Sequence, residues 1–145
     1  MAWTHDLARG LGKTLEHPVV LVGAGSFVGG NLRYYLGRWV ATWGLPGGLP
    51  WGTFFINVAG SFVLGLVAEA CLDRLEPARR LTFLLLGTGL CGGFTTFSSF
   101  EWETHALARS GRWPWALAYV GGSALAGFVA VALGAALAQW LFPRR

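Results

Sequence analysis

Phenyl and hydroxyl side chains gather within one short stretch of this chain, which runs Thr95-Thr96-Phe97-Ser98-Ser99-Phe100. On a helix, Phe97 and Phe100 share a face because they are three residues apart, and Thr96 and Ser99 form a neighbouring hydroxyl stripe. The edge of a phenyl ring is positive, so ring edges and hydroxyl donors together suit a small anion that has lost its water. The same spacing is also typical of an aromatic pair packed in a core, with the hydroxyls bonded back to their own helix.

The residues just before this stretch predict a break in the helix that carries it. Gly92 and Gly93 disfavour a helix interior, and Thr95 or Thr96 could cap a helix that restarts after them. In lipid, a break exposes backbone N–H and C=O groups, each of which costs on the order of several kcal/mol unless it is bonded. Because transporters and channels use such groups to bind ions, a break here would add ion-binding groups to the phenyl and hydroxyl side chains.

Further polar side chains lie within apolar segments. Asn57 offers both donors and an acceptor, and it could bind a ligand or simply bridge two helices. Arg33 is costly inside a membrane and is functional by default, although from its place toward a helix end it could also reach the interface. Tyr119 and Ser123 are four residues apart and put two hydroxyls on one helix face. We treat all of these as candidate functional residues.

The sequence contains no arrangement typical of catalysis. Its three histidines are scattered, and they form neither a metal-ligand spacing nor a catalytic triad. Glu101, Glu103 and His105 end one apolar segment, where we interpret them as interfacial residues. We therefore expect no enzymatic activity.

The composition is that of a membrane protein. Hydrophobic residues make up 54% of the 145 residues and charged residues only 12%, whereas soluble domains carry about 25% charged residues. The 22 glycines and 8 tryptophans agree, because glycine lets membrane helices approach closely and tryptophan favours the headgroup boundary. The net charge of +4 comes from basic residues between apolar runs and not from a basic stripe, so we expect no nucleic-acid partner.

Apolar length predicts an all-α integral membrane protein with four crossings. Spanning a bilayer takes roughly 20 mostly apolar residues as a helix. A polar or interfacial segment over residues 1–17 precedes a transmembrane domain over 18–143. The expected helices cover about 18–40, 51–72, 81–108 (broken near 92–95) and 113–142. A Gly- and Pro-rich cluster at 44–50 separates the first two.

Two further patterns leave alternatives open. Small residues recur at helical spacing, and such faces permit close helix contacts either within one protomer or between protomers; they are Gly25 and Gly29, Ser61 and Gly65, and Ala126, Ala130, Gly134 and Ala138. Lys and Arg divide seven to four between the two sides of the membrane, so either the termini are cytoplasmic or the chain inserts both ways. With so small a protomer, we expect an oligomer.

Taken together, these motifs resemble the CrcB/Fluc family of fluoride channels, from about Val22 to Leu141. The strongest element is residues 92–100, which is similar to the family's glycine-then-TTFSTF signature, with Ser99 where threonine is common. The supporting matches are residues 29–34, Gly52-Thr53, residues 57–60, and the pair Tyr119 and Ser123.

The resemblance implies a dual-topology homodimer in the cell inner (plasma) membrane, in which two antiparallel protomers form two pores that export fluoride passively. Phe97 and Phe100 would offer ring edges to fluoride, with Arg33 adding positive potential near a vestibule. The carbonyls of Gly92 and Thr95 would hold a structural sodium ion at the dimer interface. Hydrogen-bond donors along the fluoride pathway would be Asn57, Thr96, Ser99 and Ser123, on a pathway that also includes Tyr119.

Two other functions would explain part of the sequence. A small proton-coupled, multidrug-type transporter is also built from four-helix dimers, but it needs a carboxylate deep in a helix, and Glu69 sits near a helix end. A non-transporting scaffold protein would explain the small-residue faces but not the clustered phenyl and hydroxyl side chains. Both rank below the channel.

Overall fold

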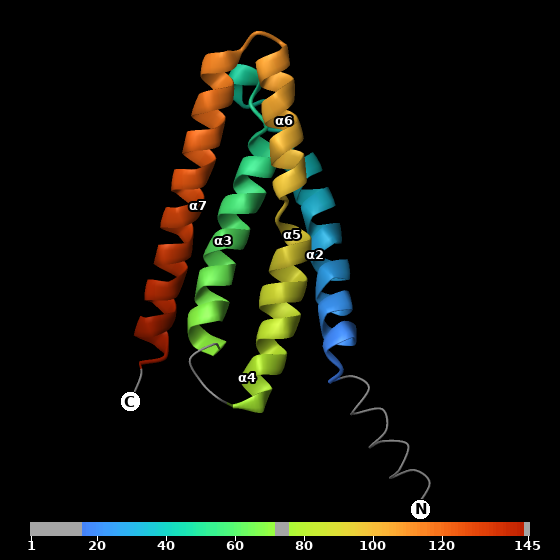
Figure 1. The fold of residues 1–145 in the computed structure, drawn as a ribbon, viewed down its shortest axis with the longest axis vertical. Helices are drawn as coiled ribbons and strands as arrows, with labels where there is room; N and C mark the ends of the chain where they lie inside the picture. The colour runs from blue at the N-terminus through green and yellow to red at the C-terminus, as the bar shows by residue number, and fades with distance from the viewer. Residues whose placement is uncertain (1–15, 72–75, 144–145) are drawn as a thin grey trace, which may run out of the picture.

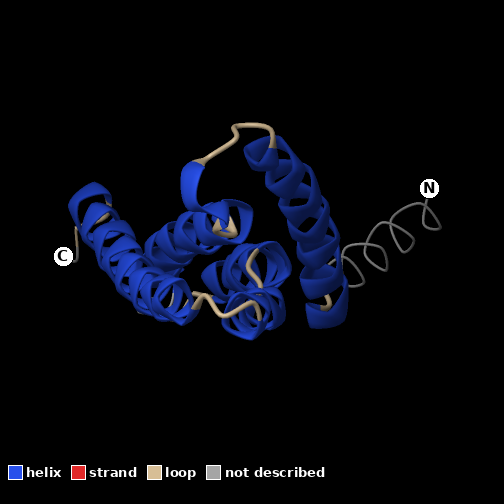
Figure 2. Cartoon of the chain, turned by 90° about the horizontal axis from the view of Figure 1, so that it is seen from above, coloured by secondary structure: helices blue, strands red, loops and turns tan. Residues whose placement is uncertain are grey.

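Four long helical stretches lie side by side along one direction (Figure 1). The computed structural model describes residues 16–71 and 76–143, and within these ranges every regular element is a helix (Figure 2). The expected polar segment at residues 1–17 lies outside the described residues, apart from its last two. The described part of the chain is therefore all-α, as the sequence predicts.

The first stretch is α2, Pro18–Ala41, where the sequence predicts a helix over about 18–40. His17 caps its N-terminus by accepting a hydrogen bond from the backbone N–H of Val19 at 3.3 Å, and Pro18 occupies the first turn, where no backbone donor is needed. Beyond it, Gly44 and Gly47 adopt positive φ angles of 59° and 85°, which glycine tolerates without strain. A 3₁₀ turn, η1 (Pro46–Gly48), follows within the Gly- and Pro-rich cluster.

The second and fourth stretches, α3 (Trp51–Cys71) and α7 (Trp113–Leu141), pack backbone to backbone. A Cβ added to Gly65 would lie 2.2 Å from the carbonyl oxygen of Val131, and one added to Gly134 would lie 2.1 Å from that of Phe62. These glycines are required for close approach. Of the two alternatives for the small-residue faces, contact within one protomer accounts for this pair.

We predict that Gly134→Ala destabilises the protein by about 1–3 kcal/mol, because the new methyl group overlaps the α3 backbone. Gly121→Ala on the same helix is the matched control. An added Cβ there meets no atom within 4 Å, so alanine should raise stability by up to about 1 kcal/mol through helix propensity. Thermal unfolding of both variants in detergent measures the difference, and equal melting temperatures would contradict the prediction.

The third stretch is composite, and it runs beside α2 (Figure 1). It begins with α4 (Pro77–Thr82), continues as the π-helix η2 (Phe83–Cys91) and then as the short α5 (Gly92–Phe94), and ends with α6 (Phe97–Arg109). Between α5 and α6, Thr95 (φ −79°, ψ 161°) and Thr96 (φ −150°, ψ 118°) have extended backbone. The expectation that Gly92 and Gly93 themselves leave the helix is wrong.

Gly92 and Gly93 do not break the helix, and Gly93 instead lets a neighbouring helix approach closely. Both are helical, and a Cβ on Gly93 would lie 2.6 Å from the carbonyl oxygen of Ser26 in α2. On the α2 side, a Cβ on Gly29 would lie 2.2 Å from the carbonyl oxygen of Leu90. Glycine on both surfaces lets α2 approach the third stretch closely. Of the two threonines predicted as alternatives for the N-cap, Thr96 caps α6.

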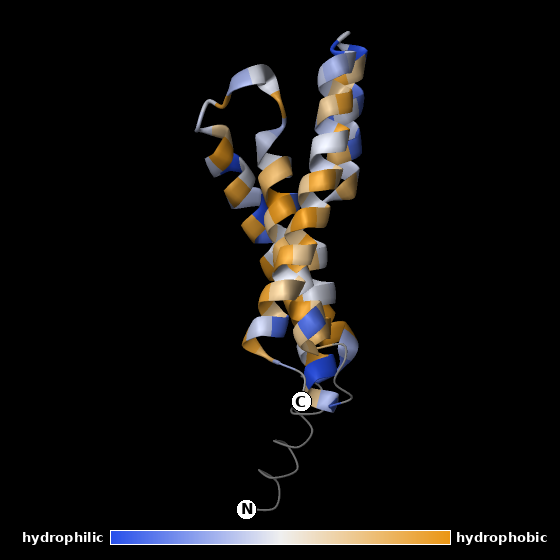
Figure 3. Ribbon diagram, turned by 90° about the vertical axis from the view of Figure 1, so that its left-hand side faces the viewer, coloured by the Kyte–Doolittle hydropathy of each residue, from blue (hydrophilic) through white to orange (hydrophobic). Residues whose placement is uncertain are grey.

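The exterior of the protomer suits lipid. Among the described residues, three helical stretches are long and apolar enough to cross a membrane, namely α3, Pro77–Arg109 and α7. Although α2 has 24 residues, it is not one of them, and it carries Arg33 and Arg38. Large apolar side chains such as Phe27 and Phe128, each 74% exposed, face outward, and hydrophobic residues predominate along the middle of the helices (Figure 3). This is a multi-pass membrane protein.

Candidate functional site

The extended residues Thr95 and Thr96 divert the hydrogen bonds that a continuous helix would make. In such a helix, the N–H of Thr96 would donate to the carbonyl of Gly92, and the N–H of Ser99 would donate to that of Thr95. Instead, the Thr96 N–H donates to Asn57 Oδ1 at 2.8 Å, and the Ser99 N–H donates to Thr96 Oγ1 at 3.3 Å. The carbonyls of Gly92 and Thr95 have thus lost their helical donors.

Asn57 of α3 binds both backbone groups of Thr96. Its Oδ1 accepts from the Thr96 N–H, and its Nδ2 donates to the Thr96 carbonyl at 3.0 Å. Of the two alternatives for this amide, bridging between helices is therefore present. One of its two amide hydrogens remains for any ligand.

Arg33 of α2 also binds the interruption. Its Nη1 donates to the carbonyl of Thr95 at 3.2 Å, so the half-buried guanidinium satisfies one of the two carbonyls that lost their helical donors. Arg33 and Asn57 come from two different helices, and together they bind Thr95 and Thr96 from two sides. The interruption is therefore held by side chains remote in the sequence.

A cavity of about 510 Å³ opens beside these residues, between α2, α3 and α6. Its polar lining consists of Arg33, Thr53, Thr96, Ser99 and Glu103. Thr96 Oγ1 donates to Ser99 Oγ at 3.0 Å, so the hydroxyl hydrogen of Ser99 is left available. The guanidinium of Arg33 and the free hydroxyl of Ser99 suit an anion, while the carboxylate of Glu103, which accepts from Thr53 and Tyr119, brings one negative charge to the same cavity.

Glu103 is a functional candidate that its place near a helix end did not indicate. Its carboxylate accepts from the hydroxyl of buried Thr53 at 2.8 Å and from that of buried Tyr119 at 3.0 Å, so it joins α6 to α3 and α7. Its interpretation as an interfacial residue stays a prediction. A signal was present: Thr96, Ser99 and Glu103 follow at spacings of three and four residues and therefore share one face of α6.

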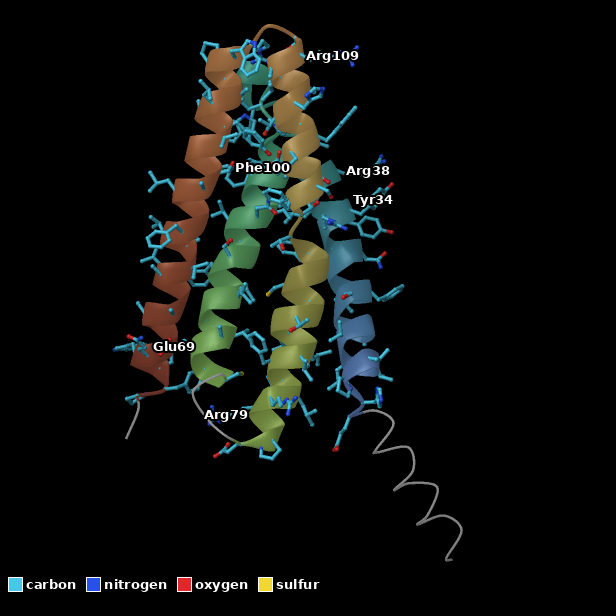
Figure 4. The ribbon with its side chains drawn as sticks, viewed as in Figure 1. Tyr34, Arg38, Glu69, Arg79, Phe100 and Arg109 are labelled. Atoms are coloured by element: carbon cyan, nitrogen blue, oxygen red, sulfur yellow. The ribbon has the colours of Figure 1, made fainter. Side chains whose placement is uncertain are left out.

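The two phenylalanines of the motif have different surroundings. Their ring centroids are 5.9 Å apart with planes tilted by 39°, but Phe97 is 74% exposed whereas Phe100 is only 9% exposed. The Phe100 ring lies 5.2 Å from that of Tyr119 and belongs to a core cluster with Leu107 and Ala116. Figure 4 shows Phe100 beside α6, toward α3 and α7. Core packing thus accounts for Phe100 within the protomer but not for Phe97.

Ser123 of α7 has an unpaired hydroxyl. Its Oγ is buried and finds no hydrogen-bond partner among the described residues. Together with Tyr119, Trp51 and Phe54, it lines a pocket of about 210 Å³. Because buried hydroxyls are normally bonded, Ser123 is a candidate for binding a ligand.

Most of the predicted residues line one of three spaces, whereas Phe100 and Gly92 line none of the three. Arg33, Thr96 and Ser99 line the 510 Å³ cavity, and Tyr119 and Ser123 line the pocket beside it, which shares Leu49, Pro50 and Trp51 as walls. A third space of about 210 Å³ is lined by Asn57, Gly60, Ser61, Leu64, Thr95, Thr96 and Phe97. Gly92 is exposed, and a Cβ added to it would meet no atom within 4 Å.

Comparison with known proteins identifies the family. A family model described as "CrcB-like protein, Camphor Resistance (CrcB)" matches residues 20–135. A protein of Chloroflexus aurantiacus named "Fluoride-specific ion channel FluC" is 41% identical over 130 residues, which cover 84% of this chain and 95% of that protein. A protein of the same name from Allorhizobium ampelinum is 45% identical over 125 residues, covering 86% and 98% respectively.

A third relative, "Fluoride-specific ion channel FluC 1" of Frankia casuarinae, is 47% identical over 123 residues, covering 83% of this chain and 95% of that protein. Both the similarity and the family model extend over all four helical stretches and include the interruption at Thr95 and Thr96. This chain therefore belongs to the CrcB-like family.

Proposed function

We propose that this protein is a fluoride-selective channel through which fluoride leaves the cytoplasm passively, which lowers its toxicity. The observation that carries the proposal is the similarity of more than four fifths of the chain to proteins named fluoride-specific ion channels. Conduction involves no covalent step, in agreement with a sequence that has no arrangement typical of catalysis.

The hydrogen bonds inside the protomer indicate which hydroxyls remain available to an anion. Ser123 Oγ is unpaired, and Ser99 retains its hydroxyl hydrogen. Thr96 already donates its hydroxyl hydrogen to Ser99, and Tyr119 donates its own to Glu103. We therefore assign direct donation to fluoride to Ser99 and Ser123, and orienting roles to Thr96 and Tyr119.

The remaining groups complete a path for a strongly hydrated ion. Fluoride gives up water only where donors replace it, and the ring edges of Phe97 and Phe100 supply positive potential without a full charge. Arg33, in the 510 Å³ cavity, attracts anions from solution. Weak contacts at several sites let the ion leave again, whereas one strong site would retain it.

We propose further that α2 is the first of four crossings, that the third is a helix broken in mid-membrane at Thr95 and Thr96, and that two antiparallel protomers pair in the cell inner membrane. Two observations support pairing. Phe97 is 74% exposed although it lies in the conducting motif, and Gly92 faces open space. A second protomer would cover both residues and complete a pore around Phe97.

A sodium ion fits the carbonyls of Gly92 and Thr95. Both have lost their helical donors, because the Thr96 N–H binds Asn57 and the Ser99 N–H binds Thr96. Carbonyl oxygens freed at a helix break are the groups with which membrane proteins coordinate sodium. A sodium ion held there by both protomers would neutralise the negative ends of these dipoles at the dimer interface.

Fluoride efflux from liposomes tests the channel. The purified protein is reconstituted with internal fluoride, valinomycin balances charge, and an electrode records release. We expect rapid fluoride release and no release of chloride in matched vesicles. A folded preparation that releases neither ion would overturn the proposal. Release that requires a proton gradient would instead favour the proton-coupled transporter, whose candidate carboxylate is Glu69.

We predict that Ser123→Ala lowers fluoride efflux at least about tenfold, which corresponds to a barrier about 1.4 kcal/mol higher, without lowering the melting temperature. The hydroxyl has no partner in the protomer, so its removal leaves no group newly unpaired. Ser110→Ala is the control, because that hydroxyl lies at the end of α6 and donates to the carbonyl of Leu107. Equal efflux from both variants would exclude Ser123 from the pathway.

A further inference from the structure

The carbonyl oxygen of Thr95 is the acceptor for one cation and the proposed ligand of another. The guanidinium of Arg33 already donates to it at 3.2 Å. The same oxygen is one of the two proposed here to hold sodium. The acid that lines this cavity, Glu103, has its two carboxylate oxygens engaged by the hydroxyls of Thr53 and Tyr119. Among the described residues, the guanidinium of Arg33 donates to this carbonyl and forms no ion pair with Glu103.

We propose that Arg33 acts as a built-in cation at the Thr95 carbonyl, and that it weakens the binding of sodium to that oxygen. The inference rests on the proposed sodium site and adds a residue that sets its affinity. Two positive charges that share one oxygen repel each other, and the repulsion is strong where water is scarce. The carbonyl can still accept both, since an sp² oxygen has two lone pairs.

The arrangement also predicts that the interruption does not depend on the ion alone. An unbonded carbonyl inside a membrane is destabilising, and Arg33 supplies the carbonyl of Thr95 with a donor from within the protein. Arg33 is thus a positioning residue for the interruption, in addition to contributing positive potential to the cavity. Removing it should make the fold more dependent on sodium, and should make sodium bind more tightly.

The test is thermal unfolding of the purified full-length protein over a range of sodium concentrations, with choline chloride holding the ionic strength constant. A ligand that binds only the native state stabilises it by RT ln(1 + [Na⁺]/Kd), so a fit of melting temperature against sodium concentration gives Kd. We call this Kd the sodium midpoint, because half of the native protein holds sodium at that concentration. For Arg33→Gln we expect a sodium midpoint at least about tenfold lower than in the parent protein. Without sodium, its melting temperature should also fall below that of the parent.

Two further variants test whether the effect on sodium affinity comes from a positive charge at the Thr95 carbonyl or from any positive charge on α2. Arg33→Lys keeps the charge, so its midpoint should stay within about threefold of the parent. Arg38→Gln removes the next arginine of α2, whose side chain donates to Tyr34 Oη at 3.3 Å. Figure 4 shows Arg38 and Tyr34 on the outer side of α2. Its midpoint should likewise stay within about threefold.

The inference is overturned if Arg33→Gln binds sodium as weakly as the parent, if neither protein responds to sodium, or if Arg38→Gln tightens binding equally. If Arg33→Gln does not fold, the test rests on Arg33→Lys. A sodium midpoint tenfold lower in Arg33→Lys than in the parent would contradict the proposal, because this variant retains the charge. Fluoride efflux from the same parent preparation separates failure of this inference from failure of the proposed function. If the parent releases fluoride but Arg33→Gln does not change sodium affinity, only this inference is overturned. If the folded parent releases no fluoride, the proposed function is overturned.

Discussion

Replacing Phe97 with isoleucine should reduce fluoride efflux by at least about 100-fold, which corresponds to about 2.7 kcal/mol in the barrier, while the protein stays folded. Isoleucine is apolar and large but has no positive ring edge to offer a dehydrated anion. Because the Phe97 ring is 74% exposed, the protomer loses little internal packing. Efflux from liposomes measures conduction, and circular dichroism with gel filtration measures folding.

The matched control for this variant is Phe128→Ile. Phe128 lies on α7 and is also 74% exposed, so the same side-chain change occurs at the same exposure but outside the conducting motif. We expect its efflux to stay within about twofold of the parent, as for a surface substitution. Phe100→Ile should also lose efflux, but with a lower melting temperature, because Phe100 packs in the core against Tyr119. Efflux retained by Phe97→Ile would exclude the ring-edge role.

The helices could be predicted from the sequence because their signals are local. Pro18 begins α2 where the sequence predicts it, and the Gly- and Pro-rich cluster at 44–50 separates α2 from α3. The third stretch begins at Pro77, earlier than its predicted start at about 81. For α3 and α7, the length of the apolar segment predicts a membrane-spanning helix. In each case, the residues that determine the element lie within it or at its ends.

The interruption could be expected but not placed, because its position depends on contacts between helices. Two adjacent glycines indicate low helix propensity, yet here they are helical, and the α2 backbone packs against Gly93. The backbone instead leaves the helix at Thr95 and Thr96, where Asn57 and Arg33 bind the freed groups. Asn57 is 39 residues from Thr96 in the sequence, and no local pattern links the two.

The candidate site could also be predicted only in part, because its contacts come from other helices. A spacing of three residues puts Phe97 and Phe100 on one helix face, but it does not say which neighbour covers which ring, and only Phe100 is covered by α7. The hydrogen bonds of Glu103 could not be predicted either, because its partners, Thr53 and Tyr119, come from α3 and α7. The residue types indicated a site for a small anion. The hydrogen-bond donors that remain free for the anion are determined by contacts between helices, which the sequence does not show.

Replacing Asn57 with leucine should lower both stability and conduction, because it removes the two hydrogen bonds that hold the extended backbone. Leucine is similar in size but leaves the N–H and the carbonyl of Thr96 unpaired in an apolar setting. Each unpaired buried group costs about 1–3 kcal/mol, so we expect a loss of about 2–6 kcal/mol in the free energy of unfolding. Efflux should fall with it, since Thr96 orients Ser99. Thermal unfolding in detergent and efflux are measured on the same preparation.

Asn31→Leu on α2 is the matched control, because it is the same substitution at an exposed asparagine. Asn31 Nδ2 donates to the carbonyl of Phe27, four residues earlier in its own helix, so its loss should cost no more than about 1 kcal/mol. Asn57→Asp keeps an acceptor for the Thr96 N–H but, when ionised, has no donor for the carbonyl, so its stability should lie between those of the parent and Asn57→Leu. If Asn57→Leu loses efflux but melts with the parent, Asn57 contacts the ion and does not hold the interruption. If it melts lower but conducts normally, the extended pair at Thr95 and Thr96 is not needed for conduction.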